Sequence, residues 1–148
     1  MKNAIIIYSK TGNTRSVAKK LSENLNCELL EVAAVNDDPN ILVPELTNKP
    51  DTTNYEYIVF ASPVHGFSLA KIMEAYLKQL PSLEGKTIDL FITHYFPFAW
   101  MGGNRALKQM ELIVKAKQAS VGKKVSVNWT SKKRDSIITN LIKDFSID

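Results

Sequence analysis

The stretch Ala4–Leu21, AIIIYSKTGNTRSVAKKL, decides the fold of this chain. It opens with Ala4–Tyr8, a continuous apolar run rich in β-branched side chains, which is typical of a buried strand. Apolar residues recur at helical spacing from Val17 onward. Between these two parts lies the polar segment Ser9–Thr14. The sequence therefore predicts a buried strand that ends in a hydroxyl-rich turn and leads directly into a helix.

The turn has the character of an anion-binding site. The first turn of a helix presents free backbone N–H groups and the positive end of the helix dipole, which together suit a phosphate. The side chains that can add hydrogen bonds to phosphate oxygens are those of Ser9, Thr11, Asn13 and Thr14. The alternative is an ordinary strand–helix connection in which Thr11 or Asn13 caps the helix.

Two well-known phosphate motifs are absent from this turn. It contains neither a G-x-x-x-x-G-K-[ST] sequence nor a G-x-G-x-x-G sequence. Its order, SKTGNT, instead resembles the [ST]-x-T-G-x-T phosphate loop of flavodoxins, which also follows the first strand. The resemblance implies that the phosphate of flavin mononucleotide (FMN) is held by Ser9, Lys10, Thr11, Gly12, Asn13 and Thr14.

Strands and helices alternate through the rest of the chain. The segment 33–55 is polar and interrupted by prolines, so we expect a long connection there, with room for one short helix over Pro39–Leu46. Ser68 is expected to cap the helix that ends before Pro81. The remaining strands are predicted at Cys27–Val32, Glu56–Ala61, Thr87–Thr93 and Lys124–Asn128, and the remaining helices at Asn104–Ala119 and Ser131–Phe145.

This alternation predicts an α/β fold with a parallel sheet covered on both faces. Five strands in this pattern suit a three-layer, doubly wound sandwich with the strand order 2-1-3-4-5, for which flavodoxin itself is the standard example. We expect a single flavodoxin-like domain over residues 1–148.

Two further loops are candidates for ligand contacts. In such a sheet the ligand lies beyond the carboxyl ends of the strands, where the connectivity reverses between strands one and three. The loop after the fourth strand is rich in aromatic residues, and aromatic clusters in loops mark contact surfaces. The candidates are Ser62, Pro63, Val64, His65, Gly66 and Phe67 in one loop and Thr93, His94, Tyr95, Phe96, Trp100, Gly102, Gly103 and Asn104 in the other.

The positions of these loops resemble those of the second and third flavin loops of flavodoxin-like proteins. The resemblance implies that backbone groups of Pro63–Gly66 meet the flavin ring and that one aromatic side chain covers a face of it. The alternatives are that the aromatic loop is a lid or a dimer contact, and that His65 and His94 are hydrogen-bonded surface groups. The candidates for stacking on the ring are Tyr95, Phe96 and Trp100.

Composition limits the class of protein. A chain of 148 residues is long enough for a full core, and no apolar run approaches the roughly 20 residues that span a bilayer. The first strand begins almost at Met1, which leaves no room for a signal peptide, so a cytoplasmic location is expected. The single cysteine, Cys27, suits that location and is expected to be a small buried hydrophobe. The histidines and the cysteine have no zinc-binding spacing.

The chain is mildly basic, with a net charge of +4. It has no Arg-rich tract with interleaved aromatic residues, so nucleic-acid binding is not expected. Electron-carrier flavodoxins are generally acidic, and this chain departs from them. The cluster Lys132, Lys133 and Arg134 opens the last helix on the expected ligand edge. It is either a solvated helix start or a docking patch for an acidic partner or a nucleotide phosphate.

Together these features favour an FMN-binding electron-transfer protein that works with a redox partner protein, with the redox chemistry on the flavin and no catalytic side chain. One alternative is a NAD(P)H-dependent quinone or nitro-compound reductase of the same fold, in which His65 or His94 donates a proton. A second alternative is a flavin-free binding or regulatory module.

Overall fold

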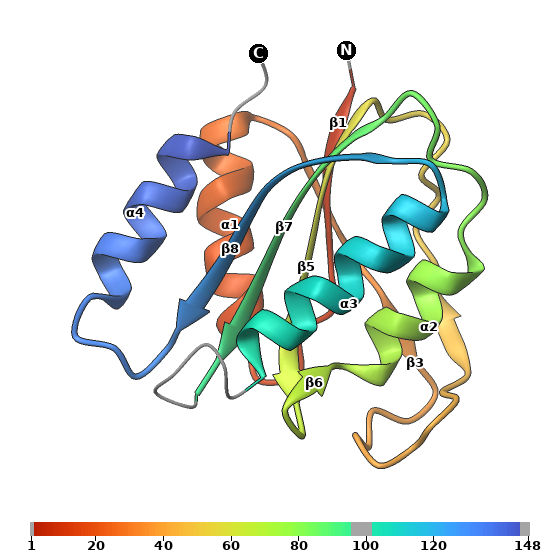
Figure 1. The fold of residues 1–148 in the computed structure, drawn as a ribbon, viewed down its shortest axis with the longest axis horizontal. Helices are drawn as coiled ribbons and strands as arrows, with labels where there is room; N and C mark the ends of the chain where they lie inside the picture. The colour runs from red at the N-terminus through yellow and green to blue at the C-terminus, as the bar shows by residue number, and fades with distance from the viewer. Residues whose placement is uncertain (1, 96–101, 146–148) are drawn as a thin grey trace.

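A mostly parallel sheet forms the middle layer of the molecule (Figure 1). The computed structural model describes residues 2–95 and 102–145. The principal strands lie in the order β2-β1-β5-β7-β8, and each neighbouring pair is parallel. In chain order this is 2-1-3-4-5, so the predicted flavodoxin-like α/β fold is confirmed. The strands are β1 (Asn3–Ile7), β2 (Glu28–Glu31), β5 (Tyr57–His65), β7 (Thr87–His94) and β8 (Ser120–Asn128), and the short β6 (Ser68–Leu69) pairs antiparallel with β5.

Helices cover both faces of this sheet (Figure 1). Ile5 and Ile7 of β1 belong to the core beneath α1 and α4, whereas Ile6 and the following Tyr8 belong to the core beneath α2 and α3. The continuous apolar run of the first strand therefore reflects burial on both faces. Within the described ranges no helix is both long and apolar enough to cross a membrane. The helices are α1 (Asn13–Leu25), α2 (Lys71–Gln79), α3 (Gly103–Ala116) and α4 (Arg134–Asp144).

The connection over 33–55 differs from the expectation. It contains a small antiparallel pair, β3 (Ala33–Ala34) and β4 (Leu46–Asn48), and no helix over the described residues 39–46. The backbone N–H of Asp38 donates to the side chain of Asn36, and that of Asn40 donates to the side chain of Asp38. Such local bonds compete with helix formation, which explains why the predicted helix is wrong.

The helix predicted to start at Ser68 starts later, because β5 is longer than expected. β5 continues to His65 and turns back into β6, so that His65 lies opposite Ser68. The turn residues Gly66 (φ 55°) and Phe67 (φ 64°) have the positive φ angles of a two-residue type I′ hairpin. Ser68 is therefore a strand residue, and Ala70 occupies the N-cap of α2 without a side-chain capping bond.

Three smaller expectations are also corrected. β8 begins at Ser120 rather than Lys124, because an irregular pairing with β7 accommodates the residues that look like a turn in the sequence. α4 begins at Arg134, because the Ser131 hydroxyl accepts a hydrogen bond from the backbone N–H two residues later and forms a local turn. Cys27 is half-buried instead of fully buried.

Candidate functional site

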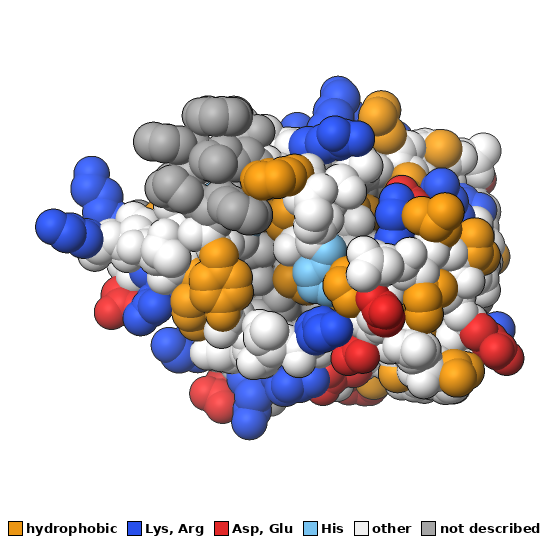
Figure 2. Space-filling view, turned by 90° about the horizontal axis from the view of Figure 1, so that it is seen from below, with side chains coloured by type: hydrophobic (Ala, Val, Ile, Leu, Met, Phe, Trp, Pro, Cys, Tyr) orange, Lys and Arg blue, Asp and Glu red, His pale blue; other side chains and the backbone are white. Residues whose placement is uncertain are grey.

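The strands β1, β5 and β7 are neighbours in the sheet, and their carboxyl ends lie at the edge that Figure 2 faces. The first loop (9–14), the second loop (62–67) and the described ends of the third loop, Tyr95 and Gly102, follow these strand ends. Hydrogen bonds join the first loop to the third: the side-chain amide of Asn13 donates to the Tyr95 hydroxyl over 2.7 Å, and the hydroxyls of Thr14 and Thr93 lie 2.8 Å apart. One exposed and one buried hydrogen bond therefore join the start of α1 to the end of β7.

The first loop leaves the start of α1 open. Gly12 occupies the N-cap with φ 98° and makes no side-chain capping bond, so neither Thr11 nor Asn13 caps the helix. The Ser9 hydroxyl accepts a hydrogen bond from the backbone N–H of Arg15 over 3.3 Å. The positive end of α1 therefore faces a loop lined with hydroxyl and amide groups.

Two further residues predicted for the phosphate contact, like Ser9 and Asn13, also have protein partners. Thr14 is buried, and its hydroxyl meets Thr93 of β7. The Lys10 ammonium donates to the backbone carbonyl of Asp37 over 3.1 Å and lies 3.8 Å from the carboxylate of the same residue. Thr14 thus ties α1 to β7, and Lys10 ties the first loop to the segment that follows β3.

The second loop brings a histidine against β1. The half-buried His65 ring meets the Tyr8 ring edge-on, with their centroids 6.0 Å apart. Burial lowers the pKa of His65, the Lys10 ammonium lowers it further, and the Asp37 carboxylate opposes them. The imidazole is therefore neutral at pH 7. Next to this pair, the Ser62 hydroxyl donates to the adjacent Pro63 carbonyl over 3.0 Å.

Helix α3 begins at two closely packed glycines. A Cβ on Gly102 would lie 2.7 Å from the Cα of Phe67, and a Cβ on Gly103 would lie 2.7 Å from the Ser126 hydroxyl oxygen. The Gly103 Cβ position is also 3.2 Å from the His94 ring, which is buried. His94 is thus not a surface group. Tyr95 and Asn104 are exposed, and the predicted contacts Phe96 and Trp100 lie outside the described residues.

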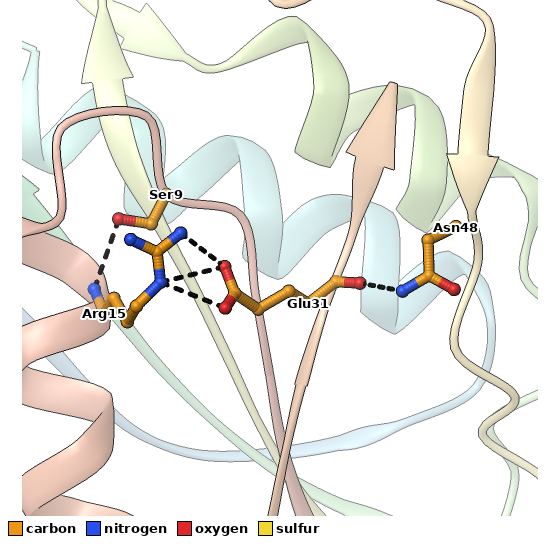
Figure 3. A network of polar contacts seen from close by, with 4 residues as sticks. All are labelled: Ser9, Arg15, Glu31 and Asn48. Carbon is orange, nitrogen blue, oxygen red and sulfur yellow. Dashed lines mark hydrogen bonds and ion pairs between the residues drawn. The ribbon is translucent and has the colours of Figure 1, made fainter. Parts of the chain in front are cut away.

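An ion pair beside the first loop was missed by the sequence reading. The Arg15 Nε atom lies 3.1 Å and 3.0 Å from the two carboxylate oxygens of Glu31, and its Nη2 atom lies 2.7 Å from one of them (Figure 3). This hydrogen bonding raises the pKa of Arg15. The Asn48 amide donates to the backbone carbonyl of Glu31 (Figure 3). A cation in the first turn of a helix is unfavourable. The position of Arg15 in the first turn of α1 was therefore the sequence signal that could have indicated an acidic partner.

The basic cluster before α4 divides into two parts. Lys132 and Lys133 are exposed. The Arg134 guanidinium lies 4.9 Å from the centre of the Trp129 ring and donates to the Trp129 carbonyl over 3.0 Å. Figure 2 shows basic and acidic side chains around the periphery of the ligand edge. Two lysines, rather than the whole cluster, are therefore free to meet an external anion.

Comparisons with known proteins identify the family. Residues 4–109 match the family model described as "Flavodoxin domain", so the chain belongs to the flavodoxin family. No curated protein sequence matches the chain.

Solved structures share its fold. The Trp repressor binding protein of Bacillus subtilis has a TM-score of 0.74 at 13% identity, covering 99% of this chain and 100% of that one. Flavodoxin 2 of Bacillus cereus has a TM-score of 0.67 at 17% identity, with coverages of 97% and 96%. A flavoprotein of Lactobacillus acidophilus NCFM in complex with FMN has a TM-score of 0.65 at 19% identity, with coverages of 94% and 97%. At these identities the likeness concerns the fold.

Proposed function

We propose that this protein binds FMN at the edge where the three loops meet and acts in electron transfer. The observation that carries the proposal is the start of α1, where the N-cap is a glycine and the Ser9 hydroxyl bonds the Arg15 N–H, within the hydroxyl- and amide-bearing Ser9–Thr14 loop. A helix start of this kind suits a phosphate. Membership of the flavodoxin family, and the FMN complex of the Lactobacillus acidophilus flavoprotein, support the choice of FMN.

The residues present match the chemical groups of FMN. Ser9, Thr11, Asn13 and the backbone of their loop would hold the phosphate. Thr14 would support this loop from below through its contact with Thr93.

The other two loops would hold the ring. Backbone groups of Pro63–Gly66 would meet its edge, and their hairpin turn fixes the direction of this backbone. The exposed Tyr95, oriented by Asn13, would cover one face.

Flavin supplies the redox chemistry when bound, and the protein binds and orients it and limits its contact with water. The hydrogen bond from Asn13 holds the Tyr95 ring at the site, and the proposal gives Tyr95 no catalytic role. His65 stays neutral at pH 7, so it adds no positive charge there under ordinary conditions.

We also propose that the redox partner is a protein with an acidic contact surface. Lys132 and Lys133 are exposed beside the ligand edge, whereas the Arg134 guanidinium lies against the Trp129 ring. Complementary charge across such a contact speeds association and orients the partner.

Titration of the purified protein with FMN and with riboflavin tests the binding proposal. Flavin absorbance and fluorescence are followed, and the protein is first freed of any flavin it carries. We expect saturable changes with FMN and much weaker binding of riboflavin, which lacks the phosphate. An unchanged FMN spectrum would overturn the proposed function, and equal affinities would overturn the assignment of the phosphate to the first loop.

A further inference from the structure

A hollow of about 370 Å³ lies beside the first loop, on its β2 side. It is lined by Tyr8, Ser9, Arg15, Glu31 and the run 32–37. The three loops of the proposed FMN site follow β1, β5 and β7, whereas this hollow lies beyond β1 and β2. It is therefore next to the proposed FMN site but on the other side of the phosphate loop. Its volume is within the range of small-molecule sites, about 300–1,000 Å³.

The charges around the hollow cancel in pairs. Arg15 pairs with Glu31, and the side chains of both are about 40% exposed. Lys10 pairs with Asp37 at the far wall. The hollow strongly favours neither a cationic nor an anionic ligand, because a charged ligand would be attracted by one member of each ion pair and repelled by the other. The Glu31 carboxylate still has unused lone pairs, and these suit a neutral ligand with hydroxyl groups to donate.

A buried hydroxyl on the floor of the hollow lacks a partner. Tyr8 is 4% exposed, and its hydroxyl makes no hydrogen bond with any part of the chain that the structure describes. Burial, and to a lesser extent Asp37, raise the pKa of Tyr8 to about 12, so this hydroxyl remains a donor at neutral pH. A buried polar group without a partner is unfavourable, and a ligand hydroxyl that reached it would relieve the loss.

Apolar residues form part of the remaining wall. Residues 32–35 are Val, Ala, Ala and Val, of which Val32 is buried and Val35 is 64% exposed. An exposed valine side chain can contact the face of a planar base. Glu31 ends β2 about 20 residues after Gly12. In the dinucleotide-binding fold, which has a different strand order and a G-x-G-x-x-G turn that this chain lacks, an acidic residue at that separation from the phosphate turn accepts a ribose hydroxyl.

We propose that the hollow binds the nucleoside part of a ribonucleotide, as a second ligand distinct from FMN. The ribose diol donates to the Glu31 carboxylate, and the base lies against the exposed Val35. The inference goes beyond the proposed function and does not depend on it, because the hollow can be tested with and without FMN.

The first test compares ligands that differ in the diol alone. Adenosine and 2′,3′-dideoxyadenosine are titrated into the ¹⁵N-labelled protein, both free of flavin and loaded with FMN, and amide shifts are followed by NMR. We expect saturable shifts around residues 31–37 with adenosine and at least tenfold weaker binding of the dideoxy compound. Equal binding of the two, or no saturable shift, would overturn the proposal.

Two further arms test the separateness of the site and the role of the base. Loss of adenosine binding on FMN loading would assign the hollow to the FMN site and overturn the proposal of a second ligand. D-ribose that binds as tightly as adenosine would overturn the nucleoside assignment, because the apolar wall would then contribute nothing.

A matched pair of variants tests Glu31. Glu31→Gln removes the carboxylate, and Glu45→Gln makes the same change at an exposed residue that does not line the hollow. We expect adenosine affinity to fall about tenfold in Glu31→Gln and to stay within twofold of the parent in Glu45→Gln. Equal adenosine affinities in the two variants would overturn the role of Glu31. Should Glu31→Gln fail to fold, the comparison of adenosine with its dideoxy analogue in the parent protein still decides the proposal.

Discussion

Two helices start at the ligand edge in the same way, yet only one start is open. α1 and α3 both begin after a glycine with a positive φ, 98° at Gly12 and 114° at Gly102, and neither N-cap carries a side-chain hydrogen bond. A Cβ on Gly12 would come no closer than 3.9 Å to a side chain, whereas one on Gly102 would strike the backbone of Phe67. The comparison shows that a helix dipole alone does not make an anion site, because the surroundings must also leave room for the ligand.

The largest expected effect comes from adding one methyl group at each start. Gly102→Ala adds a Cβ 2.7 Å from Phe67 Cα at a strained φ, so we expect a loss of about 3–5 kcal/mol in the free energy of unfolding. Gly12→Ala makes only an ordinary van der Waals contact with Arg15 and should cost only the backbone strain, about 1–3 kcal/mol. Urea unfolding of both variants measures the difference. Equal losses would contradict the close packing at the start of α3.

Variants of two threonines in the first loop should separate an effect on FMN binding from an effect on the stability of the fold. Thr11 is exposed, so Thr11→Ala should weaken FMN binding by about 1–2 kcal/mol with little change in stability. Thr14→Ala leaves the buried Thr93 hydroxyl without its partner and should cost about 1–2 kcal/mol of stability. Flavin titration and urea unfolding are run on both variants. A Thr11→Ala protein with unchanged FMN affinity would remove this side chain from the phosphate site.

The exposed lysines before α4 can be tested with a small anionic redox reagent. We expect Lys132→Glu with Lys133→Glu to slow the oxidation of the reduced, FMN-loaded protein by anionic ferricyanide severalfold at low salt, with less effect at high salt. Stopped-flow absorbance measures the rate. The control reverses the exposed Lys19 and Lys20 of α1. Equal slowing by both double variants would mean that net charge, rather than the position of the patch, matters.

An ion pair between α3 and β8 predicts a pH dependence of stability. Glu111 of α3 accepts a hydrogen bond from Lys124 of β8 over 2.8 Å, which lowers the pKa of its carboxyl from its ordinary value near 4.5 to about 2, with Lys115 adding to the effect. Because the folded pKa is depressed, the pair stabilises the fold above pH 4.5, and this contribution is lost as the pH falls toward 2. We expect a smaller acid-induced loss of stability in Glu111→Gln, with Glu84→Gln as the exposed control. Parallel stability curves for Glu111→Gln and the parent would contradict this prediction.

The smallest expected effect concerns His65. A protonated imidazole near the flavin would favour the reduced, more negatively charged cofactor and raise its potential. Burial and Lys10 lower the pKa of His65, so the difference between His65→Gln and the parent should emerge only below pH 6.5. Spectroelectrochemical titration of both FMN-loaded proteins between pH 8 and pH 5 checks it. A constant difference across that range would show that this imidazole does not sense the flavin.

Local patterns in the sequence predicted the sheet order and the first loop. The apolar run Ala4–Tyr8 and the glycine of the Ser9–Thr14 loop act through burial and backbone geometry, which neighbouring residues determine. The β5–β6 hairpin was missed because Phe67 adopts a positive φ that bulky residues rarely take. The Arg15–Glu31 pair could not be predicted, because it joins α1 to β2 through side-chain positions that depend on the packed fold.

The burial of His94 was missed for a related reason. Its position after a strand suggested the rim, but the absence of a side chain on Gly103 allows α3 to start directly over the imidazole. A sequence gives the types of the two residues at such a contact, but it does not give the distance between them in the folded chain. The segment that contains Phe96 and Trp100 lies outside the described residues, so the predicted stacking of an aromatic residue from it stays a prediction.

The hydrogen bond between Asn13 and Tyr95 has a thermodynamic consequence. It couples the residue that would read the phosphate to the residue that would cover the ring, so that ordering either one lowers the entropic cost of ordering the other. Linkage makes such coupling reciprocal. A ligand that has both a phosphate and a ring would gain an affinity that neither half possesses alone, by the same factor whichever half binds first.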